Sequence, residues 1–369
     1  MNIAILGSYN TIFTHSYLKL LRKNGHNVII INNNDMLGDC FNYKDQVNKN
    51  NSIISIVLKK ILKNFRLDKN KYILKKIEYK DIKKSLTNGE TLKLSKIIDD
   101  FSPDLFVFFW GTTLRAELKY IKENYPNVKK MLLLNTYPTR IDIETALDDF
   151  ILKSDREYFS SFDKLTLPSK MMLDHFTKNK LIIESQDVIV CPDVLFIEYD
   201  KNNKNAIKNN TKKLIFLGNT NFSERTIDDI SLTIKKLAND GCQIYIQESN
   251  DTSKIKHRNI KTFKPFTFQQ ILDGKLKEYI DSFNGVLYAY NEASFFRYNS
   301  SITTRLLLAE ECIPPVYVLG ELPIYLSDCY LDMNIKGINT FSNIENNKMV
   351  RNNNKIGDRV KLLLDFIER

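Results

Sequence analysis

The densest group of residues that could do chemistry lies between Glu292 and Pro315 (EASFFRYNSSITTRLLLAEECIPP). Guanidinium and hydroxyl side chains crowd the turn where a helix is expected to begin: Arg297, Ser300, Ser301, Thr303, Thr304 and Arg305. The first N–H groups of a helix have no partner inside the helix and carry partial positive charge, so they attract anions. Ordinary capping by Ser and Thr beside surface arginines is the plainer interpretation. The density of the cluster favours a phosphate site.

A second candidate for phosphate binding follows an expected strand at 213–217 (KLIFL). Gly218 and Asn219 come directly after this strand, and Arg225 follows shortly afterwards. A glycine lets the backbone N–H groups approach a ligand, and a nearby guanidinium adds charge and paired hydrogen bonds. This loop therefore suits a diphosphate.

The first strand of the chain also ends in a loop of interest, formed by Gly7, Ser8 and Tyr9. The loop lacks the GxGxxG pattern of dinucleotide sites, and a plain tight turn is the alternative. His15 lies just beyond it. Imidazole titrates near neutral pH, so His15 is a candidate general base, although a lone histidine is often structural.

Two later loops of the first half carry aromatic and charged side chains. Trp110, the single tryptophan, follows an expected strand at 104–109 and could offer a platform to a sugar ring, or could simply pack. The loop from Asn135 to Glu144 could supply a carboxylate that deprotonates a hydroxyl, although acids in the first turn of a helix give the same pattern. Its candidate residues are Tyr137, Arg140, Asp142 and Glu144.

The elements that must position these residues alternate along the chain. A strand at 2–6, a helix at 14–23 and a strand at 27–31 form one strand–helix–strand unit, which implies parallel strands and a right-handed crossover. The same alternation resumes at about residue 90 and again at 213, with helices expected at 170–178, 269–282 and 301–311. In such sheets, ligands bind beyond the carboxyl ends of the strands, where the candidate loops lie.

The length of 369 residues suits two domains. We predict an α/β protein with two Rossmann-like domains facing a cleft. The predicted parts are an N-terminal domain at 1–195, a polar linker at 196–213, a second domain at 214–355, and a C-terminal helix at 356–369 that is a candidate to pack back on the first domain.

The composition limits the partners. The net charge of +10 favours anionic ones, such as nucleotides, nucleic acid or an anionic membrane face. Segment 53–86 carries eleven Lys and Arg against three acids on a helical pattern. It is either a solvated helical pair or an amphipathic surface that docks on anionic lipid.

Other classes are disfavoured. The five cysteines and four histidines form no metal-ligand pattern, so we expect reduced thiols and no bound metal. The start lacks the features of a secretory signal, and no run of 18 apolar residues occurs. We therefore expect a cytoplasmic protein, with the inner face of the membrane as a site of peripheral attachment.

Four segments, taken in order, resemble the glycosyltransferases of the GT-B fold. Met1–Ile31 looks like their first strand, glycine loop, helix and second strand, and Phe162–Phe176 is similar to a late strand of the first domain. Leu214–Asn219, with Arg225, looks like the start of the donor domain. Ser301–Val316 resembles the helix and loop that hold the donor diphosphate.

The chain also departs from this pattern. Many retaining members have an acidic residue in the donor helix that binds the ribose, and Leu307 stands at the aligned place. Glu310 and Glu311 lie one turn further, and Cys312 replaces a glycine. An inverting or divergent subfamily is compatible with these departures.

The resemblance implies transfer of a hexose-like sugar from a nucleotide-sugar to a glycan or lipid-linked acceptor, in the synthesis of cell-surface polysaccharide or glycoconjugate, without a metal or other cofactor. The implied donor residues are Gly218, Asn219, Arg225, Arg297, Ser300, Ser301, Thr303, Thr304 and Arg305. The implied acceptor residues are Gly7, Ser8, Tyr9, Trp110, Tyr137 and Arg140, and the candidate catalytic residues are His15, Asp142 and Glu144.

Rival interpretations remain open. A nucleotide-sugar epimerase can share this architecture and would need no acceptor. A basic nucleic-acid-binding protein would fit the charge, but no recognition motif appears, so no specific nucleic acid is expected. A carbohydrate-binding relative without activity is the third alternative.

Overall fold

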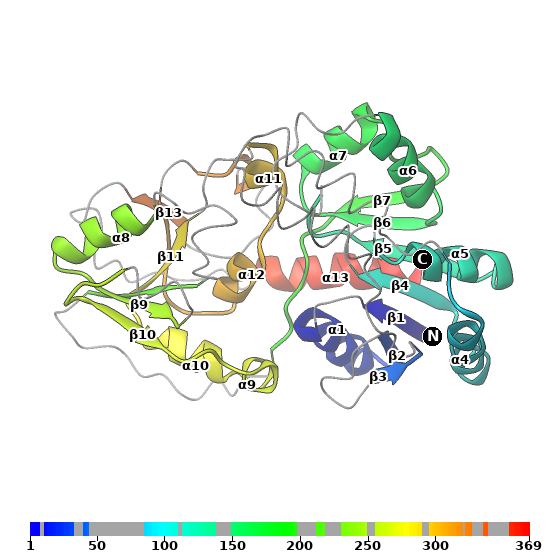
Figure 1. The fold of residues 1–369 in the computed structure, drawn as a ribbon, viewed down its shortest axis with the longest axis horizontal. Coiled ribbons are helices and arrows are strands. Elements are labelled where there is room, and N and C mark those ends of the chain that lie inside the picture. The colour runs from blue at the N-terminus through cyan, green and yellow to red at the C-terminus, as the bar shows by residue number, and fades with distance from the viewer. Residues whose placement is uncertain are drawn as a thin grey trace, which may run out of the picture. The chain divides into compact units, whose positions relative to one another are not determined.

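The computed structural model describes residues 1–7, 11–32, 40–43, 85–109, 113–137, 149–197, 212–217, 230–248, 255–289, 295–319, 322–326, 335–338 and 354–369. The chain forms two compact units, Met1–Val190 and Cys191–Arg369. Each unit is a parallel sheet flanked by helices (Figure 1). Most of the predicted linker at 196–213 and of the basic segment at 53–86 lies outside the described residues.

The described part of the first unit contains a sheet of seven strands in the order β3-β2-β1-β4-β5-β6-β7. The strands are β1 (Asn2–Gly7), β2 (Asn27–Asn32), β3 (Cys40–Asn42), β4 (Leu105–Phe109), β5 (Lys129–Leu133), β6 (Lys164–Leu167) and β7 (Asp187–Val190). The helices are α1 (Thr11–Lys23), α4 (Asn88–Phe101), α5 (Arg115–Asn124), α6 (Asp149–Phe159) and α7 (Lys170–Lys178).

The central pair of this sheet joins segments that lie far apart in sequence. Ile3 of β1 pairs with Leu105 of β4, and both strands are parallel to their neighbours. Because parallel strands must be joined by crossovers, the chain leaves β1 toward one edge and β4 toward the other. The switch point of the sheet therefore lies between the carboxyl ends of β1 and β4.

The apolar runs explain why these strands form. Ile3, Ala4 and Ile5 are all fully buried, as expected for a parallel strand covered on both faces. Tyr17 of α1 packs edge-on against Phe109 of β4, with ring centroids 4.8 Å apart. This contact seats α1 over the switch point.

The described part of the second unit contains a sheet of six strands in the order β10-β9-β8-β11-β12-β13. The strands are β8 (Lys213–Phe216), β9 (Gln243–Gln247), β10 (Ile260–Phe263), β11 (Gly285–Ala289), β12 (Val316–Leu319) and β13 (Ile335–Ile338). The helices are α8 (Ile230–Asn239), α9 (Phe268–Leu272), α10 (Lys275–Asp281), α11 (Phe295–Ser300), α12 (Thr304–Glu310), the 3₁₀ turn η2 (Ile324–Leu326) and α13 (Asn354–Glu368).

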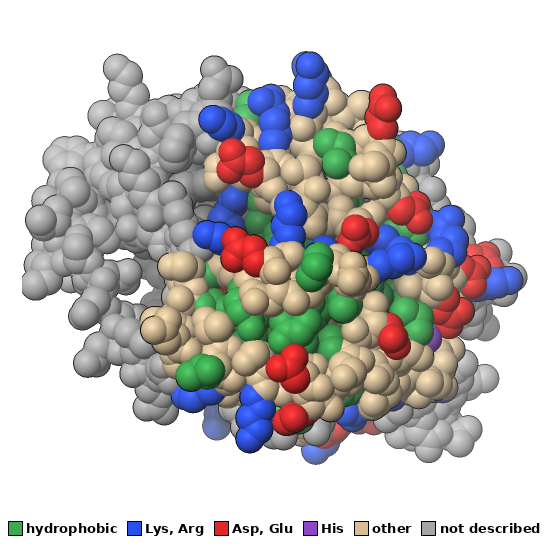
Figure 2. Space-filling view, turned by 90° about the vertical axis from the view of Figure 1, so that its right-hand side faces the viewer, with side chains coloured by type: hydrophobic (Ala, Val, Ile, Leu, Met, Phe, Trp, Pro, Cys, Tyr) green, Lys and Arg blue, Asp and Glu red, His purple; other side chains and the backbone are tan. Residues whose placement is uncertain are grey.

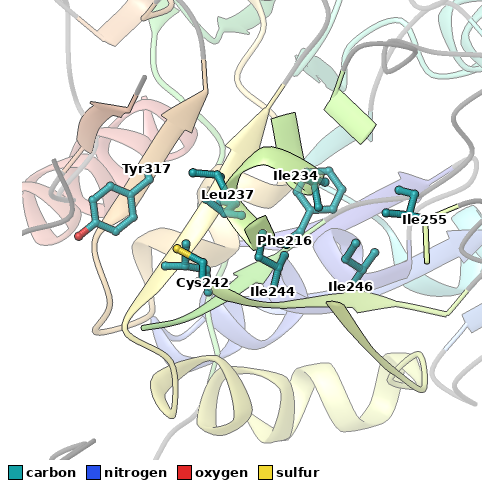
Figure 3. Packing of buried hydrophobic residues seen from close by; sticks show 11 residues of the cluster. Phe216, Ile234, Leu237, Cys242, Ile244, Ile246, Ile255 and Tyr317 are labelled. Carbon is teal, nitrogen blue, oxygen red and sulfur yellow. The ribbon is translucent and has the colours of Figure 1, made fainter. Parts of the chain in front are cut away.

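A core of apolar side chains lies between this sheet and α8. It comprises Leu214, Phe216, Ile234, Leu237, Ala238, Cys242, Ile244, Ile246, Ile255, Leu287 and Tyr317, most of which are labelled in Figure 3. Gly285 makes room for the ring of Tyr317, since a Cβ there would come within 2.4 Å of it. In the strand order of this sheet the chain leaves β8 toward one edge and β11 toward the other, so a second switch point lies between the carboxyl ends of β8 and β11.

Several predicted elements differ in detail from the observed ones. The helix expected at 269–282 is two helices, because Gly274 adopts a left-handed φ of 79° between α9 and α10. The helix expected at 301–311 is the shorter α12, and α11 precedes it. The described residues include no helix long and apolar enough to cross a membrane.

Candidate functional site

The predicted donor residues follow, in the sequence, the two strands that meet at the switch point of the second unit, β8 and β11. Leu214 and Ile215 of β8 pair with Gly285 and Val286 of β11, so the carboxyl ends of these strands are neighbours. Gly218, Asn219 and Arg225 follow β8 but lie outside the described residues. The other donor candidates lie on the crossover that leads from β11 to β12.

This crossover, residues 295–311, brings the predicted serines and threonines together. Ser300 at the end of α11 is fully buried, and Ser301 is 4% exposed. Thr303 is the N-cap of α12, yet its side chain accepts no capping hydrogen bond. The Thr303 Oγ1 atom is buried and has no partner among the described residues.

An uncapped helix start with a buried hydroxyl is unusual, because Ser and Thr at this place normally bond to an N–H group of the first turn. Here the backbone carbonyl of Thr303 accepts hydrogen bonds from the amides of Leu306 and Leu307, at 3.0 and 3.2 Å. The Thr303 hydroxyl makes no hydrogen bond with the described residues. Thr304 and Arg305 follow in the first turn and are partly exposed. The side chain of Arg297 lies outside the described residues.

Two contacts that the sequence did not reveal hold the crossover in place. The side-chain oxygen of Asn299 accepts a 2.7 Å hydrogen bond from the amide of Ile324 in η2. The hydroxyl groups of Tyr288 and Tyr325 lie 3.3 Å apart in the interior. Because η2 follows β12, these contacts connect α11 and β11 to the segment after the carboxyl end of β12. Neither pair carries a sequence signal, since their partners lie 25 and 37 residues apart.

Of the two acidic residues beyond Leu307, Glu310 is buried and Glu311 is partly exposed. Glu310 is 1% exposed and its carboxylate is bound by Arg359 of α13. Leu307 is itself buried, and the thiol of Cys312 donates to the carbonyl of Leu308 at 3.3 Å. Glu310 is therefore committed to an interior ion pair.

In the first unit, the predicted acceptor loops also leave neighbouring strands. Gly7 at the end of β1 pairs with Phe109 at the end of β4. A Cβ at Gly7 would lie 2.6 Å from the side chain of Thr14, so glycine allows α1 to pack closely on the strand. Ser8, Tyr9 and Trp110 follow these strand ends and lie outside the described residues.

His15 lies in α1, close behind the end of β1. Its side chain is 4% exposed, among the buried residues Phe13, Thr14 and Ser16. This position is at the carboxyl edge of the sheet, where a catalytic base would stand, but it is shielded from bulk water.

Tyr137 is fully buried and takes part in a charged network. Its hydroxyl donates a 2.7 Å hydrogen bond to Asp155 of α6, which is also fully buried. Arg115 of α5 binds the other oxygen of Asp155 at 2.5 Å and the carbonyl of Ser154 at 2.8 Å. The sequence pointed to Tyr137 and missed Arg115 and Asp155, whose pairing spans 40 residues. Arg140, Asp142 and Glu144 lie outside the described residues.

Aromatic rings surround this network and shape its electrostatics. The guanidinium of Arg115 lies 4.8 Å from the centroid of the Tyr158 ring, and burial raises the pKa of the Tyr158 hydroxyl. His175 lies near Tyr137, with ring centroids 5.9 Å apart. Burial, together with the charge of Lys178, lowers the pKa of His175 to about 4. His175 is therefore neutral at physiological pH.

Metal-ligand clusters are not found in the part of the chain that the structure describes, where no three His, Cys, Asp or Glu side chains gather. Cys191, Cys242 and Cys312 are buried, and none of them forms a disulfide within the described residues. Burial raises the pKa of Cys191 to about 12 and that of Cys242 to about 11, so both are protonated.

Comparisons with known proteins settle the architecture. No protein-family model matches the sequence, and no curated protein matches it. Among solved structures, the sucrose-phosphate synthase of Thermosynechococcus elongatus is similar, with a TM-score of 0.54 and 9% identity over 99% of this chain and 90% of that chain. TarM is similar as well, with a TM-score of 0.50 and 11% identity over 99% and 92%. Both are GT-B glycosyltransferases. This chain has the GT-B fold.

The GT-B fold confirms the predicted α/β class and the two Rossmann-like domains. The segments that suggested it coincide with its elements. Met1–Ile31 covers β1, α1 and most of β2, and Phe162–Phe176 covers β6 and most of α7. Ser301–Val316 covers α12 and the first residue of β12. At these identities, the likeness establishes the GT-B fold and not the activity.

A UDP-GlcNAc 2-epimerase from Neisseria meningitidis, solved with UDP-GlcNAc bound, is similar with a TM-score of 0.49 and 14% identity, over 100% of this chain and 92% of that chain. This likeness is too weak to support an argument about the reaction.

Proposed function

We propose that this GT-B chain is a glycosyltransferase that moves a sugar from a nucleotide-sugar donor to an acceptor hydroxyl. The observation that carries the proposal is the Thr303 hydroxyl, buried and without a partner among the described residues, on the crossover beside the second switch point. A buried polar atom without a partner calls for an explanation, and a bound ligand supplies one.

The donor diphosphate is the ligand that best suits this place. The start of a helix attracts anions through its first N–H groups and its dipole, and Thr303, Thr304 and Arg305 stand at the start of α12. Arg225 and Arg297 are proposed to add charge from the neighbouring loop and from α11. Together these groups would stabilise the negative charge that develops on the leaving diphosphate.

The reaction breaks the bond between the sugar carbon and the diphosphate oxygen, whose electron pair leaves with the nucleotide. The acceptor hydroxyl forms the new glycosidic bond and gives its proton to a base. We propose His15, Asp142 or Glu144 for this base, because each follows a strand of the first unit in the sequence, β1 for His15 and β5 for the two acids, and ligands of such sheets bind beyond the carboxyl ends of the strands. For Tyr137 we propose no direct contact between its hydroxyl and the acceptor, since this hydroxyl already donates a hydrogen bond to Asp155.

For the acceptor we propose a glycan or a lipid-linked precursor, in the synthesis of a cell-surface polysaccharide or glycoconjugate. The proposed location is the cytoplasm, with attachment to the inner face of the membrane through segment 53–86. This part of the proposal rests on the basic, amphipathic sequence of that segment alone.

Donor binding is tested first by thermal unfolding and calorimetry with the diphosphates and sugar conjugates of uridine, guanosine, adenosine and thymidine. A ligand that binds only the folded protein raises its melting temperature. We expect one nucleotide series to do so. Arg305→Ala should weaken that binding by about tenfold or more, because a charge-assisted contact to phosphate is lost.

Arg258→Ala is the matched control. It makes the same change of charge at an exposed arginine in the turn before β10. No shift of the melting temperature by any nucleotide at millimolar concentration would contradict the donor assignment. Equal affinity of the Arg305→Ala and Arg258→Ala variants would contradict the role of Arg305 alone.

The rival activities are separated by two further observations. Turnover of a nucleotide-sugar without any acceptor would indicate an epimerase. Strongly salt-dependent binding of DNA or RNA would indicate a nucleic-acid-binding protein. Among the described residues on the face shown in Figure 2, Lys and Arg side chains are interspersed with Asp and Glu, so these residues form no continuous basic patch there.

A further inference from the structure

The carboxylate of Glu310 and the guanidinium of Arg359 form a two-bonded ion pair inside the second unit. Arg359 Nη1 donates to Glu310 Oε1 at 2.8 Å, and Nη2 donates to Oε2 at 2.5 Å. Both side chains are 1% exposed. The pair joins the last turn of α12 to α13, 49 residues further along the chain (Figure 1).

A third segment meets at the same place. The Cys191 Sγ lies 4.0 Å from the backbone carbonyl of Arg359, and Cys191 is the first residue of the second unit. Asp193 is also buried, and its charge and that of Arg359 both act on the Cys191 thiol. Arg359 therefore stands where the entry of the chain into the unit, the crossover and the C-terminal helix come together.

The location of Glu310 argues against a simple stabilising role. A carboxylate in the last turn of a helix is unfavourable toward the helix dipole. Replacing a buried ion pair by apolar side chains of similar size often leaves stability unchanged or improves it. The two parallel hydrogen bonds between Arg359 and Glu310 fix one orientation of α12 relative to α13. Packing of the apolar residues Leu306, Leu307 and Leu308 of α12 is less directional.

We propose that Arg359 is a positioning residue for ligand binding. Its ion pair with Glu310 sets the orientation of the crossover that carries Ser300, Ser301, Thr303, Thr304 and Arg305. This inference rests on the proposed function as far as the ligand is concerned. The structural part of the inference, that the pair sets the orientation of residues 304–311, does not depend on the proposed function.

The test separates position from stability by a double variant, Glu310→Met/Arg359→Met, which keeps the volume and removes both charges. We expect a melting temperature equal to the wild-type value or higher. We also expect faster amide hydrogen exchange at residues 304–311. The affinity for the nucleoside diphosphate that binds the wild-type protein most tightly should fall by about tenfold or more, because small displacements of ligand-positioning groups are costly.

Lys130→Met is the control, since it removes a buried lysine and its ion pair with Asp163, 3.6 Å from Nζ to Oδ2, in the first unit. It should leave exchange at 304–311 and nucleotide affinity as in the wild type. If the double Met variant does not fold, Arg359→Lys is measured in the same way, since it keeps the charge without the paired geometry.

Wild-type exchange and wild-type affinity in the folded double variant would overturn the proposal. If the wild-type protein binds no nucleotide at all, the donor assignment fails, and the exchange at 304–311 still decides whether the pair sets the orientation of α12.

Discussion

The hydroxyl of Tyr137 donates a 2.7 Å hydrogen bond to Oδ2 of Asp155, a fully buried carboxylate whose other oxygen is bound by Arg115. One carboxylate thus joins the segment after β5 to α6 and to the start of α5. The stretch 138–148, with the predicted residues Arg140, Asp142 and Glu144, lies between Tyr137 and α6 in sequence. The network anchors the chain on both sides of that stretch.

Tyr137→Phe should destabilise the protein. The change leaves a buried carboxylate oxygen without its donor, and the free energy of unfolding should fall by about 2 kcal/mol, as for other hydrogen bonds to charged groups. Urea unfolding followed by circular dichroism measures the change.

The control for this variant is Tyr158→Phe. The Tyr158 hydroxyl is buried and has no hydrogen-bond partner within the described ranges. Its removal should leave stability unchanged or slightly raised, because no bond is broken. Equal losses in the two variants would show that the Tyr137–Asp155 bond contributes nothing of its own.

Thr303→Val should weaken nucleotide binding without a matching loss of stability. The Thr303 side chain makes no capping hydrogen bond, so its hydroxyl can be removed at little cost to α12. Calorimetric titration with a nucleoside diphosphate should show several-fold weaker binding, and the melting temperature should be nearly unchanged.

Thr267→Val provides the contrast. Thr267 caps α9 and accepts a 3.2 Å hydrogen bond from the amide of Gln270. Loss of this cap should cost about 1 kcal/mol of stability and leave nucleotide affinity unchanged. A stability loss in Thr303→Val as large as this, with unchanged binding, would assign Thr303 to the helix and not to a ligand.

Acid should weaken the first unit through His175. Burial lowers the pKa of this imidazole to about 4 in the folded protein, against about 6.5 in an unfolded chain. Between these values the unfolded chain binds the extra proton, so the stability that is present above about pH 6.5 is lost as the pH falls toward 4.

This pH dependence is checked with urea midpoints measured from neutral pH down to about pH 5. His175→Phe removes the titrating group and keeps a ring beside Tyr137, so its profile should be flatter over that interval. Parallel profiles for the variant and the wild type would show that His175 does not cause the loss.

Local pattern was sufficient to predict most elements of the fold. The apolar runs at 243–247 and 213–217 are the strands β9 and β8, and the helix expected at 170–178 is α7 with the same limits. The short strand β3 was not predicted, because its three residues leave too little periodicity to detect. The order of strands in each sheet is not encoded in any local pattern.

The site was predictable only in part, for a related reason. Ser300 to Arg305 stood out because hydroxyl and guanidinium groups crowd one helix start, and the structure places them on the crossover from β11 to β12. The partner of Glu310 could not be read from the sequence, since Arg359 lies 49 residues away and looks like any surface arginine of an amphipathic helix. The roles of the predicted residues stay predictions.

The strand order has a consequence for the nascent chain. β1 cannot meet its neighbour β4 until residues 105–109 have left the ribosome, and β8 waits in the same way for residues 285–289. Parallel strands cannot be joined by a hairpin, so the central strand pair of each sheet assembles late from distant segments. Arg359 emerges 49 residues after Glu310, and until then the carboxylate of Glu310 lacks the partner that holds it in the folded protein.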